Sequence, residues 1–441
     1  MTTARPQSLP WPYEAKEGWL YCQGVRLADI ARQWGTPCYV YSEAAILEAY
    51  ATLARPDPEG RSARICFAVK ANSNLAVLRI LARAGAGFDI VSAGELRRVL
   101  AAGGHPERVV FSGVGKSIHE LRYALEQGIG CINVESLAEL DQLASVASSL
   151  KRIAPISIRV NPDIDAQTHP YISTGLKENK FGLGIQDALE GYKRALKNRH
   201  LRVVGVDCHI GSQITTLKPF QDATQRLLLF ATDLHGLGIE LEHIDLGGGL
   251  GICYHDEQPP SADELKNQGL QMVANWAQST GCKEPQVVFE MGRSIVGAAG
   301  LLLSQVLLLK PSSDPEAKHF AVVDAAMNDL MRPSLYQAWH DLMLLHPSQP
   351  KAELRRWDVV GPVCETGDWL ARDRSLGLFE GDLLAFASAG AYGSTMGSNY
   401  NSRPRPPEVL LRESGQVDLI RRRETFEDLI ELEKIPRDLW D

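Results

Sequence analysis

The run Ile65-Cys66-Phe67-Ala68-Val69 ends in Lys70, and Ala71-Asn72-Ser73-Asn74 after it cannot continue the apolar pattern. A short apolar run bounded by a polar turn predicts a buried strand. Seven more such runs alternate with helix-like segments before Arg293, and they end near Asp89, Ser112, Asn133, Asn161, His209, Asp245 and Glu290. Eight alternations of strand and helix predict an α/β fold, a TIM-like (β/α)8 barrel.

A barrel of this kind carries its reactive groups at the carboxyl ends of the strands. Each run here ends in a polar or ionisable residue, which indicates a site at that end. A doubly wound sheet is the alternative fold, but its phosphate motifs are missing. Gly113-Val114-Gly115-Lys116-Ser117 imitates the end of a P-loop, yet Val110 stands where its first glycine is required. Gly247-Gly248-Gly249-Leu250-Gly251 is followed by Ile252 where a dinucleotide motif needs glycine.

After Gly292 the chain changes to longer apolar runs separated by Pro, Gly and Asp, at 301–309, 320–323, 359–363 and 383–387. These runs predict a C-terminal β-rich domain, a sandwich or a barrel. The strand expected at 37–41 has no place among the eight and should pair with that domain. Ser42 is the expected N-cap of a helix that begins at Glu43. We therefore expect a barrel domain over 44–296 and a β domain formed by 1–43 with 297–441.

The composition favours a small-molecule substrate. A net charge of −8 over 441 residues argues against nucleic acid or an anionic membrane as the main partner. The eight cysteines include no CxxC pair, so zinc sites and a disulfide framework are not expected, and no metal is expected. No secretory signal pattern and no apolar stretch of membrane-spanning length occurs, which predicts a cytoplasmic protein.

Lys70 is a candidate for covalent chemistry, because lysine forms Schiff bases with aldehydes and desolvation favours its neutral, nucleophilic form. The alternative is an ordinary solvated surface lysine.

Gly247-Gly248-Gly249 follows the strand that ends at Asp245, so its backbone N–H groups could approach a phosphate. The alternative there is a flexible turn. Gly211-Ser212 is a second candidate donor site, past the strand that ends at His209.

Glu290 ends the eighth run, where a carboxylate is costly unless it meets a cation or a donor. A protonated pyridine nitrogen would satisfy it, and a salt bridge to Arg293 or Arg159 is the alternative. His209 could stack on an aromatic ring or be a satisfied core histidine. Together, an aldehyde-trapping lysine, a glycine cradle, a ring carboxylate and a stacking histidine predict a pyridoxal phosphate site.

Longer motifs carry a resemblance to a family. They are FAVKANSN (67–74), GFDIVSAGEL (87–96), HPYISTG (169–175) with KFG (180–182), HIGSQI (209–214), DLGGGLGI (245–252), EMGRSIV (290–296), MNDLMRPSLY (327–336), CETGD (364–368) and GAYGSTMGSNYNSRPRP (390–406). With these motifs the chain resembles the diaminopimelate decarboxylases of the alanine racemase-like, fold type III pyridoxal phosphate group. The resemblance covers nearly the whole chain. It implies decarboxylation of meso-2,6-diaminopimelate at its D-centre to L-lysine and CO2, the last step of lysine biosynthesis.

The resemblance also implies roles for individual residues. Lys70 would hold the cofactor, His209 would pack on its ring and Glu290 would pair with the pyridine nitrogen. The phosphate would be contacted by Ser212, Gly249, Gly292 and Tyr392, and the expected cofactor site also includes Asp89, Arg159, Gly248 and Arg293. The substrate would be bound by Arg293, Arg332, Tyr336, Glu365 and Tyr392. Cys364 would donate a proton from the partner subunit, so a homodimer is expected, with the β domain completing the site of the other copy.

Met291 is a departure, because the family usually has proline between Glu290 and Gly292. The lost proline predicts a less rigid loop and a modest change in affinity. Two alternatives to the implied function remain. One is a decarboxylase of D-lysine, D-ornithine, carboxynorspermidine or another basic precursor, against which the two arginines and Tyr336 argue. The other is a non-catalytic, pyridoxal phosphate-binding regulatory homologue, against which Lys70 and Cys364 argue.

Overall fold

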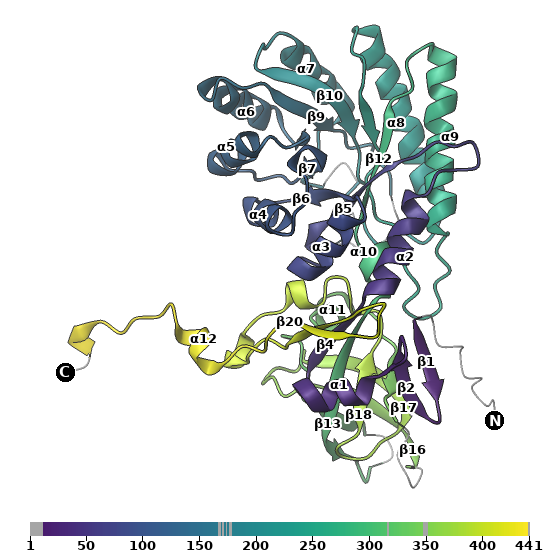
Figure 1. Ribbon diagram of the computed structural model, residues 1–441, viewed down its shortest axis with the longest axis vertical. Helices are drawn as coiled ribbons and strands as arrows, with labels where there is room; N and C mark the ends of the chain where they lie inside the picture. The colour runs from purple at the N-terminus through teal and green to yellow at the C-terminus, as the bar shows by residue number, and fades with distance from the viewer. Residues whose placement is uncertain are drawn as a thin grey trace. The chain divides into compact units, whose positions relative to one another are not determined.

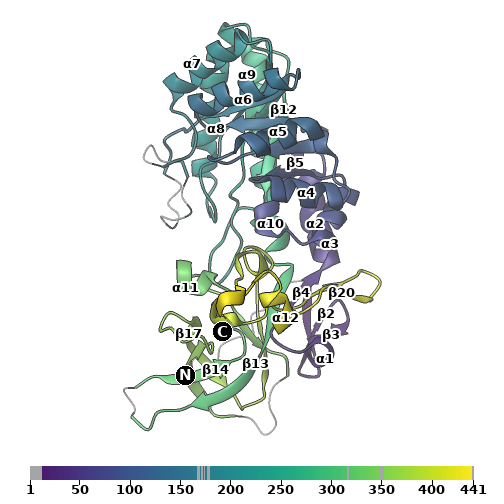
Figure 2. The same cartoon turned by 90° about the vertical axis from the view of Figure 1, so that its left-hand side faces the viewer.

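The structure is a computed structural model that describes residues 12–165, 169, 172, 174–175, 179–314, 317–346 and 352–439. The chain divides into two compact units (Figures 1 and 2). Ile46–Gly297 is here called the barrel unit, and Met1–Ala45 with Ala298–Asp441 is called the β unit. The division falls in the first turn of helix α2 (Glu43–Ala54).

Eight parallel strands form a closed barrel. They are β5 (Arg64–Ala68), β6 (Gly87–Ile90), β7 (Val109–Phe111), β8 (Cys131–Val134), β9 (Ala154–Arg159), β10 (Leu201–Asp207), β11 (His243–Asp245) and β12 (Gln286–Met291). Neighbours in sequence are neighbours in the barrel, and the pairing of β12 with β5 closes it. The (β/α)8 prediction is therefore confirmed, with each apolar run in its expected place.

A helix follows each barrel strand, and Figure 1 shows these helices around the strands. They are α3 (Leu75–Arg83), α4 (Ala93–Ala101), α5 (Ile118–Gln127), α6 (Leu137–Ser149), α7 (Ile185–Leu196), α8 (Lys218–Gly236), α9 (Ala262–Thr280) and α10 (Arg293–Val296). Short 3-10 turns lie at η1 (Val69–Ala71) and η2 (Pro106–Arg108). Side chains of Asn74, Ser92, Ser117, Ser136 and Ser261 cap helix N-termini and satisfy their first N–H groups.

The barrel interior changes from apolar to polar along its strands. Cys66, Val110, Cys131, Val204 and Val288 form one buried apolar cluster. Side chains two residues apart share a face of a strand, so the next inward position on three of these strands is polar: Ser112, Asn133 and Glu290. The strands therefore present a polar layer at their carboxyl ends on top of an apolar floor.

The β unit contains two sheets. The three-stranded sheet consists of β1 (Tyr13–Lys16), β2 (Trp19–Cys22) and β3 (Val25–Arg26). The nine-stranded sheet consists of β4 (Cys38–Ser42), β13 (Gly300–Lys310), β14 (His319–Val323), β15 (Leu342–Leu344), β16 (Leu354–Val360), β17 (Trp369–Gly377), β18 (Leu383–Phe386), β19 (Glu408–Leu411) and β20 (Val417–Arg421). The helical segments of the β unit are α1 (Leu27–Trp34), α11 (Arg332–Tyr336), α12 (Phe426–Ile430), η4 (Ser394–Met396), η5 (Tyr400–Ser402) and η6 (Arg437–Leu439).

The N-terminal strand β4 lies inside this sheet, as the sequence predicted. It pairs antiparallel with β13 and parallel with β19. Its residues Cys38 and Val40 belong to one core cluster with Leu301, Leu303 and Val409. The expected cap is also present, because the Ser42 hydroxyl accepts a hydrogen bond from the Ala45 N–H at 3.0 Å.

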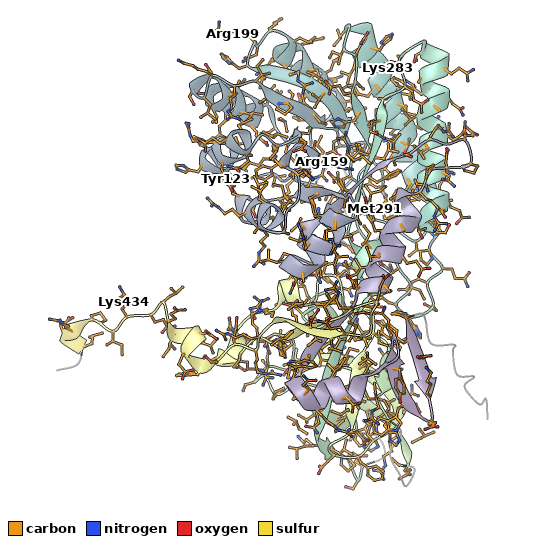
Figure 3. The ribbon with its side chains drawn as sticks, viewed as in Figure 1. Tyr123, Arg159, Arg199, Lys283, Met291 and Lys434 are labelled. Atoms are coloured by element: carbon orange, nitrogen blue, oxygen red, sulfur yellow. The ribbon has the colours of Figure 1, made fainter. Side chains whose placement is uncertain are left out.

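The sequence has a helical period over 423–433, but the helix in the structure is shorter than this segment. Helix α12 covers Phe426–Ile430 and is capped by Thr425. Leu432 beyond it is 93% exposed, and Figure 3 shows Lys434 on the same extended segment. A short helix needs packing to persist, and Pro436 disfavours helical backbone just before it.

The eight cysteines all lie within the described residues and form no disulfide bond. Among the helices of the described residues, none has the length and apolar character needed to cross a membrane.

Candidate active site at the barrel strand ends

Lys70 follows β5 in the turn η1 and forms an ion pair with Asp89 of β6. Its Nζ lies 2.7 Å from the Asp89 Oδ2 atom. The Asp89 side chain is fully buried, whereas the Lys70 side chain is 35% exposed. The other Asp89 oxygen, Oδ1, is buried and has no hydrogen-bond partner among the described residues. The buried carboxylate therefore holds the lysine amine at an accessible position on the rim of the strand ends.

Glu290 of β12 is buried beside two neutral donors. Its Oε1 accepts hydrogen bonds from the Ser112 hydroxyl at 3.3 Å and the Asn133 amide at 3.4 Å. Burial raises the pKa of the Glu290 carboxyl well above its usual range, and the nearby carboxylates add to the rise. Within the described residues Glu290 forms no ion pair, because Arg159 and Arg293 have other partners. A carboxyl in this position can pair with a cationic nitrogen that enters the site.

Arg159 is a fixed positive charge at the end of β9, and Figure 3 labels it within the barrel unit. Its Nη1 lies 3.1 Å from the Glu135 Oε1 atom, and its Nη2 donates to the His209 carbonyl at 3.2 Å. Glu135 also accepts the N–H groups of Gly113 at 2.9 Å and Gly182 at 2.8 Å. Burial works to lower the pKa of Arg159, but Glu135 and the other carboxylates raise it overall.

His209 is held as a neutral ring. Its Nδ1 accepts a hydrogen bond from the Gly248 N–H at 3.1 Å, which leaves the proton on Nε2. Enclosure among the strand ends lowers the pKa of His209 well below its usual range, and Arg159 and Lys70 lower it further. A neutral, fixed imidazole face suits packing against a flat ligand ring.

The glycine segment after β11 passes too close to its neighbours for any side chain. A Cβ on Gly248 would lie 1.8 Å from the Glu290 carbonyl oxygen, and one on Gly249 would lie 2.2 Å from the Gly211 carbonyl oxygen. Gly249 also has a φ of 103°, which strongly favours glycine. The bare backbone leaves room for an anion to approach its N–H groups.

A guanidinium group lies at this end of the barrel unit as well. Arg293 of α10 donates from Nη2 to the Ser212 hydroxyl at 2.9 Å and from Nη1 to the Tyr254 hydroxyl at 2.6 Å. An arginine and a serine that contact each other match the chemistry of a phosphate. Together, the Lys70 amine, the glycine cradle and the Glu290 carboxyl fit pyridoxal phosphate, with its aldehyde, phosphate and ring nitrogen respectively.

Met291 is the last residue of β12 and pairs with Phe67 of β5. Only 1% of it is exposed, and Figure 3 labels it within the barrel unit. Since it lies within a strand of the closed barrel, the ladder constrains its backbone in place of the family's proline. Burial also protects its sulfur from oxidation.

The β unit contains the remaining predicted residues. Cys364 is exposed, and its N–H donates to the Asn401 Oδ1 at 3.1 Å. The adjacent Glu365 accepts a hydrogen bond from the Tyr400 hydroxyl at 3.0 Å. Ser334 of α11 donates to the Gly367 carbonyl at 2.7 Å, so α11 lies next to the turn that carries Cys364.

Helix α11 also holds Arg332 and Tyr336. Arg332 is 5% exposed, and its Nη1 donates to the His340 Nε2 at 2.9 Å. Tyr392 has a left-handed φ of 55°, which is uncommon for a tyrosine and indicates a tightly constrained backbone.

The predicted residues thus fall into two groups. The barrel unit collects one group at its strand ends: Lys70, Asp89, Arg159, His209, Ser212, Gly248, Gly249, Glu290, Gly292 and Arg293. The β unit holds Arg332, Tyr336, Cys364, Glu365 and Tyr392. In the motif HPYISTG, residues 170, 171 and 173 lie outside the described residues.

Sequence reasoning assigned no role to several residues that support the site. They are Ser112, Asn133, Glu135, Asp207, Asp245 and Tyr254. All but Tyr254 lie at or directly after a barrel strand, so the polar strand ends were the signal that could have found them. Tyr254 lies in a loop, and nothing in the sequence connects it with Arg293.

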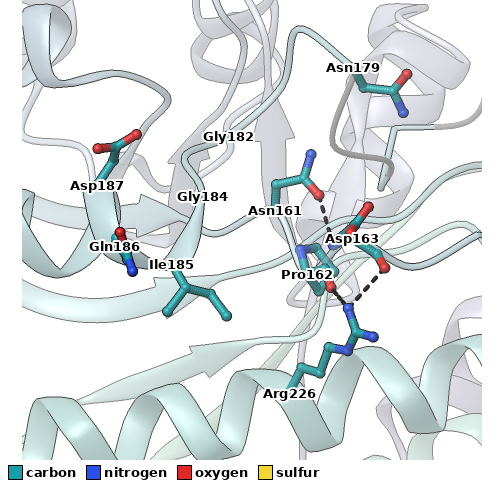
Figure 4. Close-up of a pocket in the computed structure, with 10 residues that line it drawn as sticks. All are labelled: Asn161, Pro162, Asp163, Asn179, Gly182, Gly184, Ile185, Gln186, Asp187 and Arg226. Carbon is teal, nitrogen blue, oxygen red and sulfur yellow. Dashed lines mark hydrogen bonds between the residues drawn. The ribbon is translucent and has the colours of Figure 1, made fainter.

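A separate cavity of about 630 Å³ lies beside the end of β9 (Figure 4). The guanidinium of Arg226 donates to the carbonyl oxygens of Pro162 and Asp163 at its edge. None of the candidate site residues lines this cavity.

Comparisons with known proteins agree with this geometry. Residues 45–297 match the family model described as pyridoxal-dependent decarboxylase, pyridoxal binding domain. The diaminopimelate decarboxylase of Pseudomonas aeruginosa is 55% identical to this chain, over 95% of this chain and 97% of its own length.

Two solved structures are also similar. A diaminopimelate decarboxylase from Helicobacter pylori complexed with L-lysine has a TM-score of 0.86 and 44% identity, covering 92% of this chain and 99% of that one. One from M. jannaschii in co-complex with L-lysine has a TM-score of 0.90 and 37% identity, covering 97% of this chain and 98% of that one.

Proposed function

This chain belongs to the diaminopimelate decarboxylases, and we propose that it removes CO2 from the D-configured centre of meso-2,6-diaminopimelate to give L-lysine. The observation that carries the proposal is the accessible amine of Lys70, held by the buried Asp89 carboxylate in the barrel unit that also holds Glu290 and the glycine cradle. This reaction is the last step of lysine biosynthesis.

The barrel residues have separate tasks. Bound pyridoxal phosphate supplies an electron sink for the electron pair that departing CO2 leaves behind. Lys70 would hold the cofactor through its aldehyde, and Asp89 keeps the lysine in position. Glu290 would pair with the ring nitrogen as its anionic partner, and neutral His209 would pack against the ring. Ser212, which accepts a hydrogen bond from Arg293, and the glycine backbone bind the phosphate.

The substrate's far end sets the specificity. Arg332, Arg293 and Tyr336 bind the L-configured carboxylate, because a guanidinium fork matches a carboxylate in shape and charge. Glu365 binds the amino group of that same centre. A substrate without a distal carboxylate, such as D-lysine or D-ornithine, would leave these cations unpaired, so they select for the meso compound.

Cys364 donates the proton that replaces CO2, and it comes from a second copy of the chain. We therefore propose a cytoplasmic homodimer, in which residues 1–43 with 297–441 of one copy complete the site formed by 44–296 of the other. The exposed position of the Cys364 side chain supports this role, because a proton donor must reach a separate substrate.

A substrate panel tests the reaction. The protein loaded with pyridoxal phosphate is incubated with meso-, LL- and DD-diaminopimelate, D-lysine, D-ornithine and carboxynorspermidine, and CO2 release is measured. Preference for the meso compound is expected. Preference for another compound would show that the proposed substrate is wrong. No CO2 release from any compound would favour a non-catalytic homologue.

Mixing two inactive variants tests the shared site. Lys70→Ala and Cys364→Ala are each expected to be inactive, yet mixed dimers would contain one intact site. Random exchange of subunits would restore about a quarter of the wild-type sites, because half of the dimers are mixed and each has one intact site of two. No recovery after confirmed exchange would show that Cys364 acts within its own chain.

A further inference from the structure

Three buried carboxyl groups meet at the ends of adjacent barrel strands. Asp207 ends β10, Asp245 ends β11 and Glu290 lies on β12, and one oxygen of each is within 4.8 Å of the others. Asp207 and Asp245 are direct partners in the strand register. Their exposed fractions are 1%, 0% and 5% respectively. The mechanism proposed above uses only Glu290 of these three.

The hydrogen bonds of this carboxyl trio leave two oxygens unsatisfied. Asp245 Oδ1 accepts the Gly247 N–H at 2.9 Å. Among the described residues, Asp245 Oδ2 and Asp207 Oδ1 are both buried without a hydrogen-bond partner. An unpartnered buried carboxylate oxygen is costly, whereas a protonated carboxyl supplies a donor that a neighbouring carboxyl oxygen can accept.

The charges around the trio cannot neutralise three anions. Lys70 is paired with Asp89, and Arg159 is paired with Glu135, so each nearby cation already has its own carboxylate. Arg64 at the start of β5 is the remaining cation that acts on Asp245. Burial raises the pKa values of the surrounding thiols Cys66, Cys131 and Cys208, which keeps them neutral, and His209 is neutral as well, so these groups add no charge of either sign.

Burial raises the pKa of Asp207 to about 7, partly offset by Arg159 and increased by Glu135 and Asp89. It raises the pKa of Asp245 well above its usual range, and Asp207 adds to that rise. The two groups therefore resist ionising together, as expected for carboxyls that share one site.

A proton suits this place better than a metal ion. Hard cations such as Mg²⁺ or Ca²⁺ take six or more oxygen ligands. The trio offers few, because the Gly247 N–H already bonds one Asp245 oxygen, and Ser112 and Asn133 bond one Glu290 oxygen.

We propose that Asp207 and Asp245 hold a shared proton between them and act as positioning residues for Glu290. One carboxyl donates its O–H to the other, and the pair stays at most singly charged. Glu290 is then the member of the trio that ionises when a cationic nitrogen faces it. This consequence for Glu290 rests on the proposed function, whereas the shared proton is a property of the chain alone.

Infrared spectroscopy of the cofactor-free protein tests the shared proton directly. A protonated carboxyl has a carbonyl stretch separate from that of a carboxylate, and it shifts in D2O. We expect this band at neutral pH in the wild type, with a smaller amplitude in Asp207→Asn and Asp245→Asn. Asp57→Asn is the matched control, because Asp57 is buried and paired with Arg61, which holds its pKa low. Absence of the band, or its full retention in both variants, would overturn the proposal.

The pH dependence of stability gives a second test. A carboxyl whose folded pKa is raised contributes stability that is complete below its unfolded pKa and is lost as the pH rises through its folded pKa. The wild type should therefore lose melting temperature between about pH 4 and pH 7 relative to Asp207→Asn. Equal slopes would contradict the shared proton. If Mg²⁺ or Ca²⁺ stabilised the wild type but not the variant, the trio would be a metal site and the shared proton would be wrong.

The positioning role needs a kinetic readout of the holoenzyme. Asp245→Ala should lower kcat roughly ten- to a hundredfold with little change in KM, because Glu290 loses its neighbour. Asp245→Asn keeps a neutral group of the same shape and should restore most of that loss. Equal losses in both variants would show that Asp245 acts as an anion. If the wild type released no CO2, the proposed function would fail while the infrared result would still decide the shared proton.

Discussion

Two lysines of the barrel unit form ion pairs of the same length but differ in their exposure. Lys70 follows β5 and lies 2.7 Å from Asp89, and Lys116 follows β7 and lies 2.7 Å from Glu139. The Lys116 side chain is 1% exposed, whereas that of Lys70 is 35% exposed. An ion pair alone therefore does not identify a reactive lysine.

The acceptors around Lys116 explain its role. Its Nζ donates to the Gly113 carbonyl at 2.8 Å, the Asn133 carbonyl at 2.7 Å and the Glu139 Oε1 at 2.7 Å. An ammonium has three donors, so all of them are used. Lys116 connects the ends of two strands to helix α6, and it cannot act as a nucleophile without breaking those bonds. Lys70 pairs with the Asp89 carboxylate, and its side chain is 35% exposed.

The largest expected effect is on catalysis by Lys70. Lys70→Ala should lower CO2 release from meso-diaminopimelate by at least about a thousandfold, because the covalent attachment of the cofactor is lost. The absorbance of the bound cofactor should change as well, while the melting temperature of the cofactor-free protein should stay close to wild type. Substantial activity in this variant would show that another amine holds the cofactor.

Breaking the ion pair between Lys116 and Glu139 should lower the stability of the folded protein. Lys116→Met leaves Glu139 buried without its cation and should reduce the free energy of unfolding by about 3–5 kcal/mol. Urea denaturation measures this loss. Lys116→Met with Glu139→Leu removes both charges and should recover much of the stability. A single variant as stable as wild type would mean that water replaces the lysine.

The carboxyl groups Glu290 and Glu139 can be compared in the same way as the two lysines, because burial raises the pKa values of both. Glu290→Gln keeps an oxygen for Ser112 and Asn133 but cannot carry the anion that a ring cation needs. We expect kcat to fall by roughly a hundredfold. The cofactor-free variant should become more stable than wild type as the pH rises above 4.5, because wild-type Glu290 loses stability on the way to its raised pKa. Unchanged kcat would remove Glu290 from the mechanism.

The smallest effect is expected next to Lys116. The Ser117 side chain accepts the Glu120 N–H and caps helix α5. Ser117→Ala should cost about 1 kcal/mol of stability without changing kcat. A loss as large as that of Lys116→Met would show that the cap and the buried pair unfold as one unit.

Much of the barrel could be predicted from the sequence because strand patterns are local. The apolar runs at 65–69, 203–208 and 287–289 each coincide with a strand, and the residues after them form the candidate site. The length of helix α12 was less predictable, because the helical period of the sequence over 423–433 extends beyond the residues that form the helix.

The partners of the site residues were not predictable in the same way. Glu290 had Arg159 and Arg293 as its expected alternatives, and the structure gives it Ser112 and Asn133 instead. These two residues are 178 and 157 positions away in the chain. No local pattern records which of several polar strand ends face each other across a closed barrel.

The sequence by itself determined the strands, the order of the barrel and the residue types at the strand ends, because burial patterns and turn residues act over a few neighbouring positions. Its longer motifs also identified the family. Only the tertiary structure decided that Lys116 is saturated, that Lys70 is accessible and that Asp207 and Asp245 lie against Glu290. Exposure, charge balance and shared protons depend on distances between remote segments, and those distances exist only in the folded barrel.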